Sequence, residues 1–151
     1  MRQTRILFVC HGNICRSPMA EYVFKDIVKK AGREEEFCIA SAAVSREAVG
    51  GDIYYDAKAA LREHGIPFSK HRAHQVTEEE MRSYDLVIIM DESNRQYIKR
   101  MFGEKYREKV HLLMEYTGRS RSVSDPWYTD DYDTAIQDIL AGCKALYAAL
   151  P

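Results

Sequence analysis

Apolar runs and amphipathic stripes alternate along this chain. Four short segments are apolar at most of their positions, which is typical of strands that are buried on both faces of a parallel sheet. They are Arg5–Cys10, Phe37–Ala42, Leu86–Met90 and Val110–Met114. Between these segments, apolar residues recur at the spacing of three and four that gives a helix one buried face. The clearest of these stripes comprises Ala20, Val23, Phe24, Ile27, Val28 and Ala31. This alternation predicts an α/β fold.

Capping residues and glycines mark where the helices are expected to begin and end. Ser17 suits the cap of the first helix and Gly32 its end, and Thr77 with Glu80 forms a capping box before a short helix. The helices are expected at residues 17–32, at about 52–64 with Asp52 as cap, after 77, at 91–103 and at about 133–149. Residues 117–131 are expected to form a polar loop. The predicted fold is a small doubly wound sheet of four parallel strands flanked by about five helices.

Length and composition predict a single domain that covers residues 1–151. Apolar residues make up 46% and charged residues 30%, which excludes a disordered chain. The net charge of −1 excludes a broad basic face, so we expect no nucleic-acid partner. The first apolar run is too short for a signal peptide or a membrane span. We therefore expect a cytoplasmic monomer with no membrane partner, whose four cysteines are mostly reduced.

The candidate chemistry is concentrated in the loop between the first strand and the first helix. This loop reads Cys10-His11-Gly12-Asn13-Ile14-Cys15-Arg16-Ser17-Pro18. Gly12 can adopt backbone angles that other residues avoid, and Asn13 tolerates the left-handed conformation. The N–H groups of the loop can then converge on one point at a helix amino terminus, which makes an anion site. Arg16 adds a planar fork of donors that fits two phosphate oxygens.

Cys10 stands at the base of this cradle, where the phosphorus of a bound phosphate ester would lie. The helix terminus and Arg16 favour the thiolate, which is the nucleophilic form of cysteine. We therefore expect in-line attack and a phosphocysteine intermediate. The loop N–H groups and Arg16 would stabilise the charge that develops on the phosphoryl oxygens. Ser17 is expected to donate its hydroxyl to the sulfur.

Other interpretations of this loop are weaker. A Cys-x5-Arg pattern alone is also compatible with a buried strand end and a surface arginine. The setting of the pattern favours the phosphate site. A strand precedes the loop, Gly12-Asn13 lies inside it, and Ser17-Pro18 begins a helix directly after it. A nucleotide-binding P-loop needs a second glycine and a lysine, which this loop lacks. A non-enzymatic anion-binding module would need neither Cys10 nor an acid to protonate a leaving group.

Cleavage of a phosphate ester needs a proton for the leaving oxygen, and Asp125 is the candidate donor. It lies after the fourth strand, in a segment that can reach the same sheet edge as Cys10, and Pro126 stiffens the chain behind it. Trp127 and Tyr128 would suit an aromatic leaving group such as phosphotyrosine. An Asp-Pro turn without a catalytic role stays an alternative. The neighbouring acids, whose position near a helix start favours capping, are Asp130, Asp131 and Asp133.

Together these segments resemble the low-molecular-weight protein tyrosine phosphatases. The resemblance rests on the loop from Cys10 to Pro18, on Asp91-Glu92-Ser93-Asn94 and on Asp125-Pro126, and it extends in order through 41–43 and 71–77. It implies phosphotyrosine-containing proteins as partners and no cofactor or metal. It also implies that Cys10 is the nucleophile, that Arg16 binds phosphate in the transition state, and that Asp125 is the general acid and then the base.

The resemblance also assigns supporting residues. Asn13 and Ser17 would order the loop, Asp91 and His71 would support it, and Cys15 would form a reversible disulfide with Cys10 under oxidising conditions. A plain packing role is the alternative for Cys15, and capping or packing is the alternative for Asp91 and His71. The substrate-binding set is expected to be His11, Gly12, Asn13, Ile14, Cys15, Ser17, Glu47, Trp127 and Tyr128.

One position departs from the pattern of the family. Many members have an aromatic cleft wall after the second strand, where this chain has Glu47, so one side of the cleft is expected to be polar. Two related activities are weaker alternatives. A protein-arginine phosphatase carries threonine where this chain has Ile14. A thiol-coupled arsenate reductase needs further cysteines near the third strand, where residues 82–89 contain none.

Overall fold

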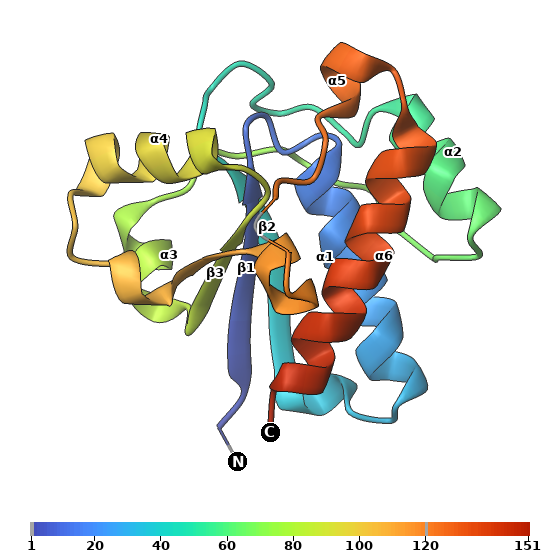
Figure 1. Ribbon diagram of the computed structural model, residues 1–151, viewed down its shortest axis with the longest axis horizontal. Helices are drawn as coiled ribbons and strands as arrows, with labels where there is room; N and C mark the ends of the chain where they lie inside the picture. The colour runs from blue at the N-terminus through green and yellow to red at the C-terminus, as the bar shows by residue number, and fades with distance from the viewer. Residues whose placement is uncertain (1, 120) are drawn as a thin grey trace.

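The structure, a computed structural model, describes residues 2–119 and 121–151. At its centre lies a sheet of four parallel strands in the order β2-β1-β3-β4. The strands are β1 (Thr4–Cys10), β2 (Phe37–Ala43), β3 (Leu86–Ile89) and β4 (Val110–Leu112). Helices cover both faces of this sheet (Figure 1), so the predicted doubly wound α/β fold is confirmed.

Sequence signals account for most of the helix ends. The capping box predicted at Thr77 and Glu80 is present, Asp91 and Asn94 form a second one, and Asp131 caps the last helix. No helix among residues 2–119 and 121–151 is both long enough and apolar enough to cross a lipid bilayer. The α-helices are α1 (Arg16–Lys30), α2 (Tyr55–Glu63), α3 (Glu78–Ser83), α4 (Glu92–Phe102), α5 (Pro126–Thr129) and α6 (Tyr132–Ala149).

Asp52 was predicted to cap the second helix, but it does not. That helix, α2, begins at Tyr55. The Asp52 carboxylate instead pairs with Lys58 at 2.7 Å and accepts a hydrogen bond from the backbone N–H of His71 at 3.0 Å. The residue therefore ties α2 to the segment that follows it in the chain, and Lys58 lowers the pKa of Asp52 to about 2.

The end of the fourth strand and the loop before the last helix also differ from the prediction. The fourth strand ends at Leu112 rather than Met114, because residues 113–117 form a 3₁₀ turn. The expected polar loop 117–131 contains the short helix α5, which begins at Pro126 after the capping residue Asp125. The described residues therefore form six α-helices, where about five were expected.

The core lies on both faces of the sheet, because side chains alternate along each strand. On one face, Ile6 and Phe8 of β1 pack with α1, α2 and α6. On the other face, Leu7 and Val9 pack with α3 and α4. Each aliphatic side chain buried in this way stabilises the fold by about 1.5–3 kcal/mol. Cys143 of α6 is fully buried on the face that packs with α1 and α2.

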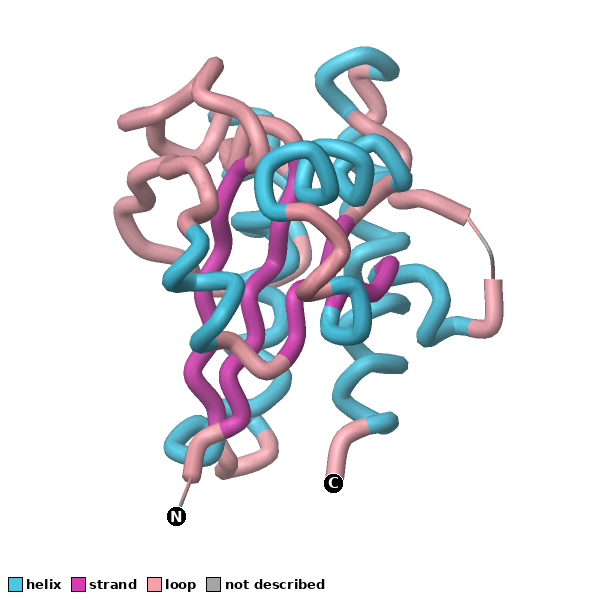
Figure 2. The backbone as a smooth tube through the Cα atoms, turned by 90° about the vertical axis from the view of Figure 1, so that its left-hand side faces the viewer, coloured by secondary structure: helices cyan, strands magenta, loops and turns pink. Residues whose placement is uncertain are grey.

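The carboxyl ends of the strands meet at one edge of the sheet, because all strands run in the same direction. Figure 2 shows loops gathered above this edge, whereas both chain ends lie at the opposite edge. Cys10 at the end of β1 pairs in register with Ala43 at the end of β2. Doubly wound sheets bind ligands beyond the carboxyl ends of their strands. The fold therefore places Cys10 where a ligand is expected.

Candidate active site

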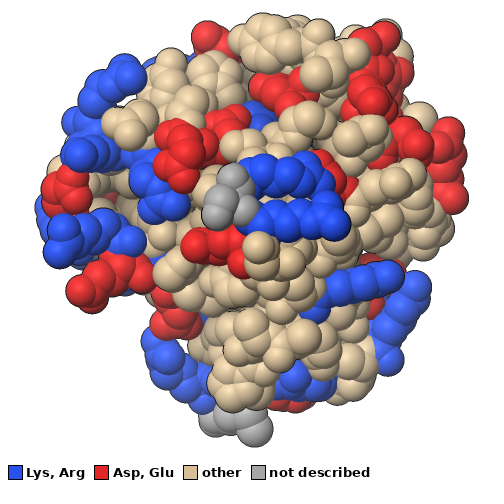
Figure 3. Space-filling model, viewed as in Figure 1, with Lys and Arg blue, Asp and Glu red and all other residues tan. Residues whose placement is uncertain are grey.

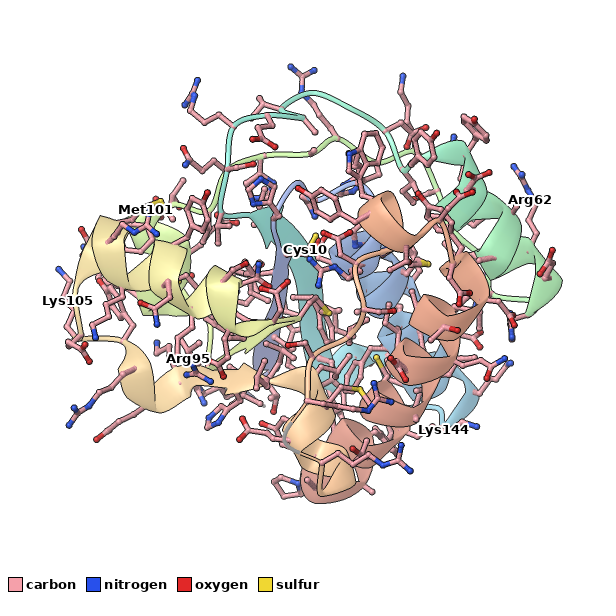
Figure 4. The ribbon with its side chains drawn as sticks, turned by 45° about the horizontal axis from the view of Figure 1, so that its top comes forward. Cys10, Arg62, Arg95, Met101, Lys105 and Lys144 are labelled. Carbon is pink, nitrogen blue, oxygen red and sulfur yellow. The ribbon has the colours of Figure 1, made fainter. Side chains whose placement is uncertain are left out.

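The loop after β1 folds around the sulfur of Cys10, which lies beneath the loops at the carboxyl edge (Figure 4). Asn13 makes the sharp turn: its φ of 61° is left-handed, as its residue type permits. Its backbone N–H donates to Cys10 Sγ at 3.3 Å. Gly12 does not adopt a positive φ, and a Cβ there would make only ordinary contacts with Ala48 and Ile14. The conformational role expected of Gly12 thus belongs to Asn13.

Ser17 contacts the sulfur instead of capping the helix. The residue before α1 is Cys15, and its side chain makes no capping hydrogen bond. Ser17 Oγ lies 3.0 Å from Cys10 Sγ and accepts a hydrogen bond from Asn13 Nδ2 at 2.8 Å. The hydroxyl hydrogen of Ser17 is therefore available to the sulfur. The capping role predicted for Ser17 is wrong, and the donation of its hydroxyl to Cys10 fits the observed geometry.

A buried polar network that was not predicted supports this loop. Asn13 Nδ2 also donates to Ser41 Oγ at 2.9 Å, and the Ser41 hydroxyl donates to Glu21 Oε1 at 2.6 Å. His71 Nε2 donates to the backbone carbonyl of Asn13 at 2.7 Å, which gives His71 the supporting position that the resemblance implied. Satisfied buried networks of this kind specify one geometry. The signal in the sequence was a polar residue, Ser41, near the end of the buried strand β2.

Arg16 lies beneath the cleft and is only 2% exposed. Its Nη1 donates to Asp91 Oδ2 at 2.8 Å and to the carbonyl oxygen of Val123 at 3.0 Å. Its Nη2 donates to Asp125 Oδ2 at 3.3 Å. Burial acts to lower the pKa of Arg16, but Cys10, Asp125 and Asp91 outweigh burial and raise that pKa overall. The guanidinium therefore keeps its charge next to the sulfur.

Asp91 both caps a helix and supports the site. Its side chain accepts from the backbone N–H of Asn94 at the start of α4, and its other oxygen pairs with Arg16. Burial acts to raise the pKa of Asp91, but the Arg16 guanidinium and the Ser93 hydroxyl outweigh burial and lower it. The two roles that the sequence left as alternatives for Asp91 therefore occur together.

Asp125 reaches the site through the chain segment before it. The backbone N–H of Val123 donates to the carbonyl oxygen of Met90 at 2.9 Å, which attaches this segment to the end of β3. Asp125 then caps α5, with Oδ1 accepting from the N–H of Trp127 at 3.1 Å. Its other oxygen faces Arg16, and its side chain remains 26% exposed. Asp125 is thus fixed and open to a ligand at the same time.

These groups surround a cleft of about 230 Å³. Asn13 and Ser17 do not line it, because both are fully buried within the loop beneath it. Ala48 lines the cleft and was not predicted. The predicted residues that line the cleft are Cys10, His11, Gly12, Ile14, Cys15, Arg16, Glu47, Asp125, Trp127 and Tyr128.

The two sides of the cleft differ in chemistry. Trp127 packs edge-on against Tyr54, with ring centroids 5.2 Å apart, and forms an aromatic side. Glu47 forms a polar side and pairs with His11, with Oε2 and Nε2 2.9 Å apart. Tyr54, which was not predicted, therefore packs against the aromatic side without lining the cleft.

Comparison with known proteins identifies the family. The family model described as low molecular weight phosphotyrosine protein phosphatase matches residues 5–151. The chain belongs to this family. The low molecular weight protein-tyrosine-phosphatase YfkJ of Bacillus subtilis is 36% identical over 147 residues, which cover 96% of this chain and 94% of that protein. The human low molecular weight phosphotyrosine protein phosphatase is 36% identical over 145 residues, which cover 93% and 91%.

Crystal structures of other phosphatases share the fold. The structure of YfkJ from Bacillus subtilis has a TM-score of 0.95 and 35% identity, and the match covers 99% of this chain and 95% of that chain. The Drosophila arginine phosphatase DARP has a TM-score of 0.86 and 27% identity, and covers 95% of each chain. The predicted membership of the phosphatase family and its enzyme class, a cysteine-dependent phosphomonoester hydrolase, are confirmed.

The second thiol of the phosphatase loop is expected to react with alkylating agents far more slowly than Cys10. Burial raises the pKa of Cys15 to about 12, although its contact with the Tyr132 hydroxyl acts to lower it. Near neutral pH Cys15 is therefore a thiol, and the thiolate is the form that iodoacetamide alkylates. Mass spectrometry after brief alkylation should find label on Cys10 and none on Cys15. Labelling of both residues at equal rates would contradict this expectation.

Proposed function

We propose that this phosphatase hydrolyses phosphotyrosine in proteins through a phosphocysteine at Cys10. One observation carries the proposal: a sulfur, a guanidinium and a carboxyl group, from Cys10, Arg16 and Asp125, line the same cleft. A nucleophile, a cation for the phosphoryl oxygens and a proton donor are the groups that cleavage of a phosphate monoester requires.

In the first step, the sulfur attacks the phosphorus of the bound ester. A bond between Cys10 Sγ and phosphorus forms, and the bond between phosphorus and the tyrosine oxygen breaks. Arg16 and the other loop N–H groups stabilise the equatorial oxygens, while the N–H of Asn13 donates to the sulfur. Asp125 donates a proton to the leaving tyrosine oxygen.

The contact between Asp125 and Arg16 prepares this proton transfer. Asp125 Oδ2 accepts a hydrogen bond from Arg16 Nη2 at 3.3 Å. In the proposed mechanism, an oxygen of the bound phosphate takes the place of this carboxylate oxygen. An arriving phosphate dianion displaces this carboxylate from the guanidinium, and repulsion between like charges favours its protonated form. Binding of the substrate thus prepares Asp125 to act as an acid.

In the second step, Asp125 accepts a proton from water, and the water oxygen attacks phosphorus. The bond between phosphorus and sulfur breaks, and the products are inorganic phosphate and the thiolate of Cys10. The hydroxyl of Ser17, 3.0 Å from the sulfur, stabilises the departing thiolate.

The lining of the cleft favours an aryl phosphate over phosphoarginine. Trp127 and Tyr128 offer aromatic surface, and Ile14 is a larger apolar side chain than the threonine expected of an arginine phosphatase. The similarity to the arginine phosphatase DARP makes phosphoarginine the second candidate. Turnover of phosphotyrosine, phosphoserine and phosphoarginine under one set of conditions decides between them. Higher kcat/KM for phosphoarginine than for phosphotyrosine would overturn the assignment.

The partners and the location of the enzyme are also part of the proposal. Membership of the phosphatase family supports proteins that carry phosphotyrosine as partners, and the net charge of −1 supports the absence of a nucleic-acid partner. We propose a cytoplasmic monomer that acts without a membrane. We also propose that oxidation joins Cys10 to Cys15, because both thiols line one cleft. A reductant would then restore activity after mild peroxide treatment.

Asp125→Ala is expected to slow poor leaving groups far more than good ones. Phenyl phosphate needs a proton on its leaving oxygen, and loss of the acid should lower its kcat/KM by about 10²–10³-fold. This ratio reports the steps up to the phosphocysteine and excludes the later hydrolysis, which is common to both substrates. p-Nitrophenolate leaves with little help, so p-nitrophenyl phosphate should lose much less. Asp130→Ala is the matched control, since Asp130 does not line the cleft. Equal losses on both substrates in Asp125→Ala would remove Asp125 as proton donor.

A further inference from the structure

The mouth of the cleft presents two kinds of surface to a protein substrate. Trp127 and Tyr128 are 57% and 82% exposed, and the Glu47 side chain is 75% exposed. All three line the cleft that leads to Cys10. The residues next to a phosphotyrosine that enters the cleft therefore meet both the aromatic side and the Glu47 carboxylate.

Glu47 is held in position by its neighbours. Its Oε2 lies 2.9 Å from His11 Nε2, and the His11 ring packs edge-on against Tyr97 of α4 with centroids 5.5 Å apart. The Ser45 hydroxyl donates to the backbone carbonyl of His11 at 2.9 Å, which ties the Glu47 segment to the phosphate loop. A carboxylate fixed in this way loses less conformational entropy when it binds a ligand.

The described residues that line the cleft carry two carboxylates, those of Glu47 and Asp125, and one cationic side chain. Acidic side chains also gather over α5 and the start of α6 (Figure 3), where Asp130, Asp131 and Asp133 are exposed, although none of these three lines the cleft. Among the described residues, buried Arg16 is the only lysine or arginine that lines the cleft. Exposed Arg46, next to Glu47 in the chain, does not line it. A cationic side chain beside the phosphotyrosine would thus meet a favourable potential.

From this arrangement we infer that Glu47, positioned by His11, selects phosphotyrosine sites that have an arginine or lysine directly beside the phosphotyrosine. The inference rests on the proposed phosphotyrosine activity. A cation on that neighbour forms a charge-assisted hydrogen bond with Glu47, whereas an acid is repelled. Because the pair is exposed to solvent, the expected preference is about fivefold and declines in high salt.

The preference should appear in KM. The flanking residue does not change its bonding during phosphoryl transfer, so its contact with Glu47 is equal in the ground state and the transition state. An interaction of that kind changes KM and leaves kcat unchanged. Variants of Glu47 should therefore differ from the wild type mainly in KM for peptides that carry a charged residue beside the phosphotyrosine.

The test uses four phosphotyrosine peptides of otherwise identical sequence. Each carries one arginine or one glutamate, placed directly before or directly after the phosphotyrosine. The wild-type enzyme should prefer the arginine peptide about fivefold in kcat/KM at one or both positions. Glu47→Gln should remove most of this preference, and Glu47→Arg should reverse it. Arg46→Gln, a loss of charge at the neighbouring residue, should retain it.

His11 is tested as a positioning residue by a pair of variants. His11→Phe removes the donor to Glu47 and should weaken the arginine preference. His11→Gln keeps a side-chain donor and should retain that preference more fully. The readout is the ratio of kcat/KM between the two peptides of each pair, which a general loss of loop stability would not change.

Two results separate this inference from the proposed function. Equal peptide ratios in wild type, Glu47→Gln and Glu47→Arg, with free phosphotyrosine still turned over, would overturn the role of Glu47 alone. Failure of the wild type to turn over free phosphotyrosine while it cleaves another monoester would overturn the proposed function instead. Circular dichroism of each variant establishes that the ratios are measured on folded protein.

Discussion

Cys10→Ser is expected to lower turnover of p-nitrophenyl phosphate by more than about 10⁴-fold while the fold is retained. A serine hydroxyl is not ionised near neutral pH and has no adjacent base in this loop. The smaller oxygen can keep the two contacts of the sulfur, with the N–H of Asn13 and the hydroxyl of Ser17. Steady-state kinetics and thermal unfolding together measure the two parts of this expectation.

The matched control is the same substitution at another cysteine. Cys38 lies on β2 and does not line the cleft, so Cys38→Ser should retain nearly all activity. Cys10→Ser should still bind inorganic phosphate, because the loop amides and Arg16 remain. Activity of Cys10→Ser within tenfold of the wild type would remove the sulfur from the mechanism.

The parts of this phosphatase that the sequence predicted are local in the chain. A continuous apolar run, a seven-residue turn and a helical stripe follow one another from Arg5 to Ala31, so their order alone places Cys10 and Arg16 at a sheet edge. The four-stranded sheet followed from similar runs, because burial on both faces requires apolar residues at nearly every position. Asp125 could be predicted as the proton donor because a leaving group needs a proton and this acid stands before Pro126, after the fourth strand.

The parts that the sequence did not predict depend on contacts between distant segments. Arg16 bonds to Asp91 and Val123, which lie 75 and 107 residues away, and no local pattern shows that these three meet. The hydrogen bonds from Asn13 to Ser41 and from Ser41 to Glu21 likewise join three segments, which are the phosphate loop, β2 and α1. Ser17 was expected to cap a helix because serine commonly does so, but its tertiary contact with the sulfur prevailed over that local preference.

Arg16→Lys is expected to lower kcat for phosphotyrosine by about 10³-fold, the second-largest effect of a substitution in this site. Lysine retains the positive charge but offers a point of charge where arginine offers a planar fork. The fork of Arg16 donates to Asp91, Val123 and Asp125, and in the proposed mechanism it also binds two phosphoryl oxygens. An ammonium group cannot keep Asp91 and at the same time bind two oxygens in the transition state.

Stability measurements separate this catalytic role from a structural one. The folded pKa of Asp91 is lowered, partly by Arg16, so this pair stabilises the fold above the ordinary pKa of 3.8 and loses its effect as pH falls through the folded value. Arg16→Ala leaves Asp91 without its cation and should lower the free energy of unfolding by about 3 kcal/mol near neutral pH, with a smaller difference in acid. Arg16→Lys should lose much less stability, yet nearly as much kcat. If Arg16→Lys instead kept wild-type kcat, charge alone would suffice, and the planar fork would have no part in the transition state.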